Sequence, residues 1–181
     1  MSRPPDTRDF EALYDRCAAS VLSYCARRTT LELAEDALAE TFSVAWRRRD
    51  AIPSEPLPWL YGVARKVIAN QRRSARRQAA VARRLVEEAP APSAHETPET
   101  PESSRRVLVA LSRLGETDRE LLLLVAWEGL KPAEAARVLG IAPARCRLRL
   151  HRARRRLERL VAHADRPSET ELKAQAKEAP S

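Results

Sequence analysis

The chain has 181 residues, enough for one domain or two small ones, and its many alanines, leucines, arginines and glutamates with only four glycines favour helices over strands. Its formal net charge of +8, from 33 basic and 25 acidic residues, points to a polyanionic partner, although bulk charge does not distinguish DNA, RNA and an acidic membrane surface. The longest strongly apolar run, residues 121–127, is too short to span a bilayer, and the N-terminus has no apolar signal segment, so we expect a cytoplasmic protein without direct membrane insertion.

Two helices are predicted at the start of the chain. The first begins near Asp9, and its apolar residues recur at helical spacing: Phe10, Leu13, Tyr14, Cys17, Val21, Tyr24 and Cys25. Thr29 followed by Glu32 fits a capping box that opens the second helix. The predicted apolar face of the second helix consists of Leu31, Ala34, Leu38, Phe42, Ala45 and Trp46.

A third, longer helix follows a proline-containing turn. Prolines 53 and 56 forbid continued helix in the turn, whereas Pro58 suits the first turn of the next helix. The predicted buried face of this helix is Leu60, Val63, Ala64, Val67 and Ile68. The three helices predict a first domain over residues 9–88, after a disordered segment of residues 1–8.

Residues 89–104 contain several prolines and small polar residues without apolar periodicity, which predicts a flexible linker. Fully extended, this linker spans at most about 50 Å at roughly 3.3 Å per residue. One turn of duplex DNA is about 34–36 Å. Two domains joined in this way can therefore reach sites somewhat more than one helical turn apart.

Helical periodicity resumes at Arg105 and predicts a second domain over residues 105–161. A short helix ends at Gly115, and Thr117 with Glu120 fits a capping box for a helix that runs to Gly129. Further helices begin at Pro132 and at Pro143; the first ends at Gly140 and the second at about Val161. Residues 162–181 are polar and predict a disordered tail.

The last two predicted helices have the proportions of a helix-turn-helix, with the turn at Gly140. The buried stripe of the final helix is predicted to be Cys146, Leu150, Ala153 and Leu157. Its other faces are strongly basic and carry Arg145, Arg147, Arg149, His151, Arg152 and further arginines. A helix this positive fits a recognition helix in the major groove of DNA better than the alternative, a solvated amphipathic helix.

The third helix combines two aromatic residues, Trp59 and Tyr61, with a basic continuation that includes Arg72 and Arg73. Aromatic rings stack on unpaired bases while arginines follow the backbone, so this pattern indicates a site for single-stranded nucleic acid. For either aromatic residue taken alone, a place in the core is the default interpretation.

A different surface is predicted on the second helix, where Glu32, Asp36 and Glu40 recur every four residues. In a basic protein this acidic stripe is consistent with a basic protein partner. A merely solvated face explains it equally well.

No catalytic, metal or cofactor site is predicted. The three cysteines, Cys17, Cys25 and Cys146, lack metal-ligand spacing, and we interpret them as small buried residues rather than as a zinc site or a redox switch. His95, His151 and His163 have no carboxylate or cysteine at ligand spacing, and no glycine-rich phosphate loop occurs. We therefore do not expect an enzyme.

Several segments together match the pattern of one family. Phe10, Leu13 and Tyr14 precede residues 34–42, with the sequence AEDALAETF, and residues 58–65, with the sequence PWLYGVAR. The later segments are Glu128-Gly129-Leu130, Glu134, Ala136, Leu139-Gly140 and residues 149–154. In order and spacing, residues 10–86 and 105–160 resemble regions two and four of the extracytoplasmic-function (ECF) sigma factors of the sigma-70 family.

This resemblance implies an all-α protein with two small helical domains, a region-two three-helix bundle and a region-four helix-turn-helix, joined by a flexible linker. It implies an alternative sigma factor, a non-catalytic subunit that binds core RNA polymerase and directs initiation at specific promoters. The acidic stripe of Glu32, Asp36 and Glu40 would bind the polymerase clamp helices. Family members are commonly restrained by an anti-sigma factor, so the resemblance also implies such a partner, of unknown identity.

The resemblance also assigns DNA contacts. The loop of residues 48–57 would take an unstacked base of the minus-ten element. The nearby DNA-binding residues would be Trp59, Tyr61, Arg65, Lys66, Asn70, Arg72 and Arg73. Residues 143–156 would lie in the major groove of the minus-thirty-five element, with contacts from Arg145, Arg147, Arg149, His151 and Arg152. The apolar outer surface of region four would meet the polymerase flap.

Five residues depart from the usual family pattern, one of them Lys131, which stands in place of the serine that usually caps the helix before Pro132. Ala39 stands in place of a glutamine and Lys66 in place of an asparagine. Arg145 stands in place of a threonine and Leu148 in place of a serine. Lys66 removes a base-reading amide and adds a cation suited to phosphate, so the promoter preference is expected to depend on these positions.

Two other functions fit parts of the sequence. A stand-alone helix-turn-helix regulator would explain residues 132–156, and dimerisation would favour it, but it leaves the linker and residues 34–46 unexplained. A pure protein-interaction module, such as an anti-sigma antagonist or decoy, would predict no DNA binding even with core polymerase. The basic helices argue against it.

Overall fold

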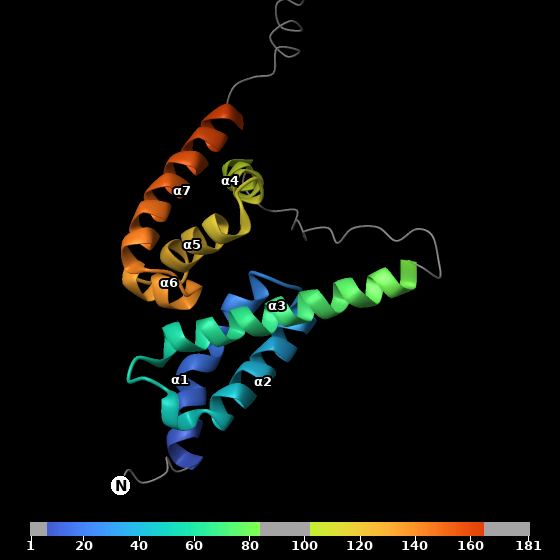
Figure 1. The fold of residues 1–181 in the computed structure, drawn as a ribbon, viewed down its shortest axis with the longest axis vertical. Coiled ribbons are helices and arrows are strands. Elements are labelled where there is room, and N and C mark those ends of the chain that lie inside the picture. Colours follow the sequence, from blue (N-terminus) through green and yellow to red (C-terminus); the bar gives the residue numbers. More distant parts are fainter. Residues whose placement is uncertain (1–6, 84–101, 165–181) are drawn as a thin grey trace, which may run out of the picture. The chain divides into compact units, whose positions relative to one another are not determined.

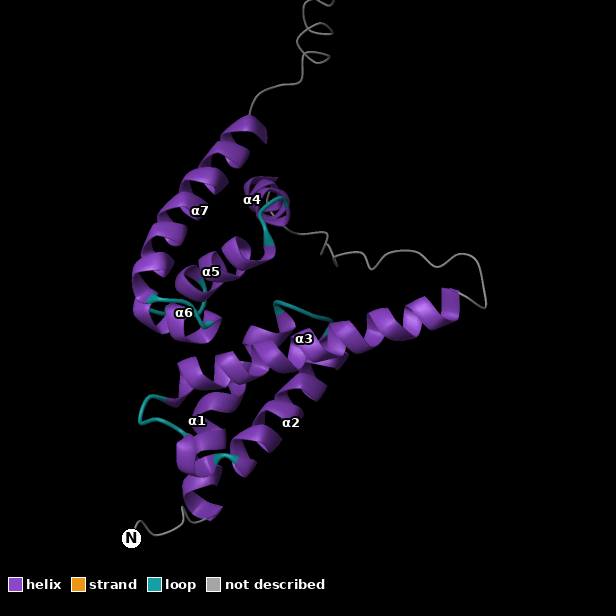
Figure 2. Ribbon diagram, in the orientation of Figure 1, coloured by secondary structure: helices purple, strands orange, loops and turns teal. Residues whose placement is uncertain are grey.

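The structure is a computed structural model that describes residues 7–83 and 102–164 (Figure 1). These residues form helices and short connections, and no strand occurs among them (Figure 2). They divide into two compact units, one built on α1, α2 and α3 and one built on α4, α5 and α7. The prediction of an all-α protein with two small helical units is confirmed. The predicted disordered N-terminus and tail, and most of the predicted linker, lie outside the described residues.

The first unit contains α1 (Thr7–Ala26), α2 (Leu31–Arg47) and α3 (Pro56–Arg83), each of which packs against the other two (Figure 1). The core is formed by the predicted apolar stripes, and its fully buried side chains include Val21, Tyr24, Ala34 and Leu60. The rings of Tyr24 and Tyr61 stack with centroids 4.9 Å apart, which joins α1 to α3. Burial of such large side chains supplies most of the stabilisation of a small helical bundle.

Three residues assigned to the apolar stripes of α1 and α2 are exposed, and this part of the prediction was wrong. Leu31 is 65% exposed because it is the first residue of α2. Tyr14 and Trp46 lie at the rim of the bundle, where aromatic rings meet edge to face. Ring centroids are 4.7 Å apart for Tyr14 and Phe42, and 5.0 Å apart for Trp46 and Phe10. One side of each ring is thus covered while the other faces solvent.

Both predicted capping boxes were wrong. The N-cap of α2 is Thr30 rather than Thr29, and it makes no side-chain cap hydrogen bond. The N-cap of α5 is Gly115, whose carbonyl accepts hydrogen bonds from the backbone amides of Asp118 and Arg119 at 3.0 Å. Thr117 therefore lies inside the helix. Acidic residues in the first turn of α5 stabilise the free amides by charge instead.

A short 3-10 helix (Arg49–Ala51) connects α2 to the loop before α3. The third helix begins at Pro56, which places Pro58 in the first turn as predicted. Over 28 residues α3 is about 42 Å long at 1.5 Å per residue. Only its first half carries the buried apolar residues, and most side chains from Asn70 to Ala79 are exposed.

The second unit contains α4 (Glu102–Ser112), α5 (Glu116–Ala126) and α7 (Pro143–Ala164), with α4 and α5 both packed against α7. Leu111, Leu121, Leu124 and Leu150 are among its buried residues. Most predicted helix ends shift by a few residues: α4 stops at Ser112, α5 stops at Ala126, and α7 continues to Ala164. Two apolar residues of α4, Val107 and Leu108, are exposed.

The short helix α6 (Pro132–Leu139) lies between α5 and α7 in the chain. Gly129 before it and Gly140 after it both have φ of 67°, in the left-handed region that favours glycine. At its C-terminus the Ile141 amide donates to the Ala136 carbonyl over 3.0 Å. This bond is typical of a helix ended by a left-handed glycine, and it confirms the predicted stop at Gly140.

Candidate nucleic-acid interface

The inner face of α7 matches the prediction. Cys146, Leu150 and Ala153 are buried, and Leu157 is half-buried. The Cys146 thiol donates a hydrogen bond to the Pro132 carbonyl over 3.2 Å, which ties the start of α7 to the start of α6. Burial raises the pKa of the Cys146 thiol, as it does for Cys17, so both groups favour the neutral form.

The outer faces of α7 carry the predicted basic residues. Arg145, Arg147, His151 and Arg152 are all exposed. Further exposed arginines follow toward the C-terminus: Arg154, Arg155, Arg156 and Arg159. With Glu158 as the one acid on this helix, the whole surface attracts an anion such as a nucleic-acid backbone.

Arg149 has a different environment from the other arginines of α7. Its Nε donates a hydrogen bond to Oδ1 of Asp118 in α5 over 2.5 Å. The side chains of Arg149 and Asp118 are 40% and 21% exposed, respectively. Asp118 therefore neutralises part of the Arg149 charge and fixes its orientation through Nε. No local pattern in the sequence points to Asp118 as the partner of Arg149, because the two residues are 31 positions apart.

The basic residues predicted on α3 lie along its exposed sides. Lys66, Asn70, Arg72 and Arg73 are exposed and Arg65 is half-buried. Two of the arginines are oriented by neighbours: Arg72 donates to the Arg28 carbonyl over 2.6 Å, and Arg73 donates to the Asn70 side-chain oxygen. The basic surface of α3 is thus partly held in place by hydrogen bonds within the first unit.

The two aromatic residues at the start of α3 occupy different places. Tyr61 is only 4% exposed and stacks on Tyr24. It therefore lies in the core, which was the default interpretation for either aromatic residue taken alone, and not on a DNA-binding surface. Trp59 is half-buried. Of the two rings, only that of Trp59 has a surface that a base can reach without displacing the core.

The acidic stripe of α2 is solvent-facing. Glu32, Asp36 and Glu40 are all exposed, as the helical spacing predicts. Glu40 forms an ion pair with Arg47 at 3.3 Å, in which both side chains are more than half exposed. A pair of this kind contributes little to stability, so a competing cation can replace Arg47 at small cost.

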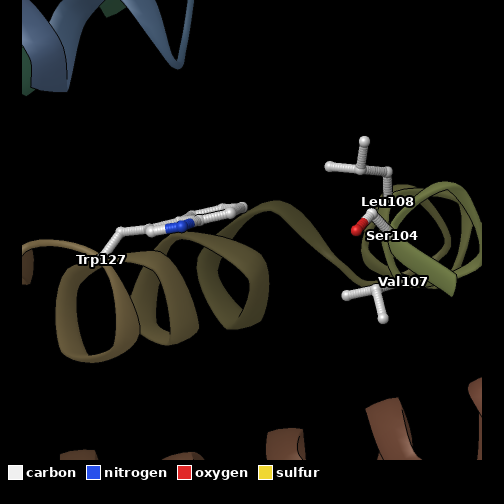
Figure 3. Close-up of a pocket in the computed structure, with 4 residues that line it drawn as sticks. All are labelled: Ser104, Val107, Leu108 and Trp127. Carbon is white, nitrogen blue, oxygen red and sulfur yellow. The ribbon is translucent and has the colours of Figure 1, made fainter. Parts of the chain in front are cut away.

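An apolar surface lies on α4 and the end of α5. Ser104, Val107, Leu108 and Trp127 line a shallow pocket there. Figure 3 shows the Trp127 ring extending from the end of α5 toward Val107 and Leu108 on α4. Val107, Leu108 and Trp127 are 37%, 50% and 52% exposed, respectively. These apolar side chains are left partly open to solvent.

Within residues 7–83 and 102–164, no group of three or more His, Cys, Asp or Glu side chains is arranged to hold a metal ion. None of the described helices is both long and apolar enough to cross a membrane. Cys17, Cys25 and Cys146 are buried and form no disulfide.

Two family matches account for most of the described residues. Residues 13–78 match Sigma-70 region 2, and residues 104–157 match Sigma-70, region 4. The chain is 34% identical over 152 residues to the ECF RNA polymerase sigma factor SigL of Mycobacterium tuberculosis, covering 81% of this chain and 85% of that protein. It is 34% identical over 157 residues to the RNA polymerase sigma factor CarQ of Myxococcus xanthus, covering 84% and 88%.

Solved structures agree on the fold. The sigma factor RpoE of Bartonella quintana, solved with the anti-sigma factor NepR, matches with a TM-score of 0.66 at 23% identity, over 88% of this chain and 100% of that one. CnrH, solved with the cytosolic domain of CnrY, matches with a TM-score of 0.60 at 25% identity, over 89% and 92%.

Two helical units, each with a basic helix, are typical of a protein that binds nucleic acid. The chain belongs to the sigma-70 family of RNA polymerase sigma factors, in its ECF group. It is an alternative sigma factor, a non-catalytic specificity subunit that directs RNA polymerase to promoters. The predicted family and function are confirmed. A stand-alone helix-turn-helix regulator does not account for the region 2 match.

Proposed function

We propose that α7 of this sigma factor binds in the major groove of the minus-thirty-five element. The observation that carries this proposal is the exposure of Arg145, Arg147, His151 and Arg152 on the N-terminal half of a helix whose inner stripe is buried. Arginine makes bidentate contacts with guanine edges and also binds phosphate. Arg149 contributes differently: because Asp118 holds its Nε, it binds phosphate through the terminal nitrogens rather than reaching into the groove.

The basic part of α3 binds the minus-ten element in this proposal. Arg65, Lys66, Arg72 and Arg73 follow the phosphate backbone, Asn70 lies among them, and the half-buried Trp59 stacks on the edge of the melted region. The segment of residues 48–57, which contains the 3-10 helix and ends in the first turn of α3, takes an unstacked base. Tyr61 supports this surface from the core, because its stacking on Tyr24 holds the start of α3 against α1.

Core polymerase binds to two surfaces. The acidic stripe of Glu32, Asp36 and Glu40 meets the clamp helices, supported by its exposure and by the weak pairing of Glu40 with Arg47. The apolar pocket surface of Val107, Leu108 and Trp127 meets the flap, supported by its exposed apolar side chains. Each surface differs chemically from the two DNA-binding helices, so one chain can bind polymerase and promoter together.

The units that carry these surfaces are residues 9–88 and 105–161, as the sequence predicts, joined through residues 89–104. In the solved structures, the sigma factor RpoE is in complex with the anti-sigma factor NepR, and CnrH is in complex with the cytosolic domain of CnrY. We propose that an anti-sigma factor also holds this chain inactive, in the cytoplasm, by covering surfaces that polymerase needs.

Run-off transcription with purified core polymerase and fragments of the host genome tests the proposed function. The full chain is expected to bind promoter DNA poorly alone and to produce new, discrete transcripts when core enzyme is added. A chain in which Arg147 and Arg152 are both alanine is expected to lose most of this activity. Absence of any new transcript with the unaltered chain would contradict the proposal.

A further inference from the structure

Leu148 is an apolar side chain at the centre of the basic outer face of α7. It is 51% exposed, although the leucine at position 150 in the same helix is buried. Leu148 is two positions from both Cys146 and Leu150, and with 3.6 residues per turn it points about 160° away from each of them. It therefore faces directly away from the core of the second unit.

The neighbours of Leu148 on this face are the residues three and four positions away along the helix. They are Ala144, Arg145, His151 and Arg152, and all four are exposed. The exposed apolar residues Val107, Leu108 and Trp127, by contrast, lie next to one another. A protein partner that covered Leu148 would have to bury two arginines with it, whereas the major groove of DNA accepts the arginines and the leucine together.

The chemistry of the groove then defines what Leu148 can recognise. A leucine side chain forms no hydrogen bond with a base edge or a phosphate. The apolar group that base pairs present in the major groove is the C5-methyl group of thymine. Contact between the two removes apolar surface of both groups from water.

We propose that Leu148 contacts a thymine methyl group in the minus-thirty-five element and makes the chain prefer thymine at that position. The proposal rests on the proposed placement of α7 in the major groove. Side chains three or four positions apart have Cβ atoms about 5–6 Å apart. Bases along one strand are about 3.4 Å apart. The preferred thymine therefore lies one or two base pairs from the bases or phosphates contacted by Arg145 or Arg152.

The first step of the test is a selection with holoenzyme, assembled from core RNA polymerase and the full chain. Promoters with a randomised minus-thirty-five element are selected by binding and sequenced, for the unaltered chain, L148S and L148A. The matched control is L31A, which truncates another exposed leucine, on α2. The unaltered chain and L31A are expected to enrich thymine at one position, and both Leu148 variants are expected to lose that enrichment.

The second step removes only the methyl group. In the best selected promoter, each thymine of the element is replaced by uracil, one at a time, and holoenzyme occupancy is measured. At one position uracil is expected to weaken binding by the unaltered chain about fourfold, the effect of one buried methyl group, and to leave binding by L148A unchanged. Thermal unfolding of L148A checks that the fold is intact.

The outcomes separate the two proposals. If holoenzyme selects a promoter but Leu148 variants keep the same thymine preference, or if uracil affects L148A as much as the unaltered chain, the role of Leu148 is wrong while the proposed function stands. If no sequence is selected and no transcript forms with any variant, the proposed function itself fails.

Discussion

The hydrogen bond between Asp118 and Arg149 joins α5 to α7 on the flank of the basic surface, with 2.5 Å between Oδ1 and Nε. This ion pair fixes the orientation of Arg149, one of the arginines predicted to bind DNA. Because Asp118 is mostly covered and Arg149 is partly exposed, the pair both stabilises the helix contact and limits where the arginine can reach. Its removal is expected to affect stability and DNA binding in opposite directions.

Replacing Asp118 with asparagine is expected to lower the free energy of unfolding by about 1 kcal/mol, since the partial exposure of the pair screens its charges. The same change frees the Arg149 charge for a phosphate group. The slope of the logarithm of the holoenzyme–promoter binding constant against the logarithm of the salt concentration is therefore expected to become steeper, by about the amount that one phosphate contact contributes. Urea unfolding and binding titrations across a salt series measure these effects. E158Q is the matched control, because it removes the same charge from an exposed side chain of α7. An equal change in salt dependence for both variants would show that only net charge matters.

Arg147 and Arg152 are expected to contribute most to minus-thirty-five recognition. Alanine at either position should weaken promoter binding by about 1–3 kcal/mol if the arginine reads a base, and should relax the sequence preference at one position. Competition binding with single-base promoter variants distinguishes a base contact from a phosphate contact, which weakens all sequences equally. The control is R159A, near the C-terminal end of α7, where Arg159 donates to the Arg155 carbonyl. Unchanged occupancy would remove the substituted arginine from the interface.

The acidic stripe of α2 is expected to control holoenzyme assembly. Reversing Asp36 and Glu40 together to lysine should weaken binding to core polymerase about tenfold or more, because like charges then face each other in the complex. Circular dichroism should show an intact fold, since both side chains are exposed. E11K, an equally exposed acid on α1, serves as the control. Normal assembly of the D36K/E40K chain would refute the clamp assignment.

We expect Tyr61 to have a structural role and Trp59 to have a role in promoter opening. Replacing the buried Tyr61 with alanine should cost about 3–5 kcal/mol of stability, as for other large aromatic side chains in a core. Y61F keeps the ring that stacks on Tyr24 and should fold and melt promoters nearly normally. W59A should be more stable than Y61A. It should nevertheless open promoters less well than the unaltered chain and Y61F. Permanganate reactivity of melted thymines, measured beside urea unfolding, checks this pair of expectations. Loss of melting in a stably folded Y61F chain would show that the tyrosine hydroxyl acts on DNA.

The sequence predicted those parts of the structure that depend on regular spacing. Examples are the buried stripe of Cys146, Leu150 and Ala153 and the glycine that ends α6. Both were predicted correctly because helical periodicity and a left-handed helix end depend on residue types that are close together in the sequence. The burial of Tyr61 and the pairing of Arg149 with Asp118 depend on residues far away in the chain. Such partners leave no local signal, so only the three-dimensional arrangement identifies them.

Both capping boxes were wrong for a related reason. A Thr followed three residues later by Glu occurs at each site, yet the helices begin at neighbouring residues with no side-chain cap bond. The helices begin where the backbone dihedral angles become helical, after Thr30 and after Gly115. A pattern of residue types does not specify these angles to the residue.

The separation of α7 into an inward and an outward face bears on how such proteins diversify. Two separate sets of residues alternate along this helix with helical periodicity. One set packs against α4 and α5, and the other set faces solvent. Substitutions at outward positions, of which Leu148 is one, can change the DNA sequence preferred by a duplicated copy without a folding penalty. A family of regulators with distinct gene sets can therefore arise on one unchanged scaffold.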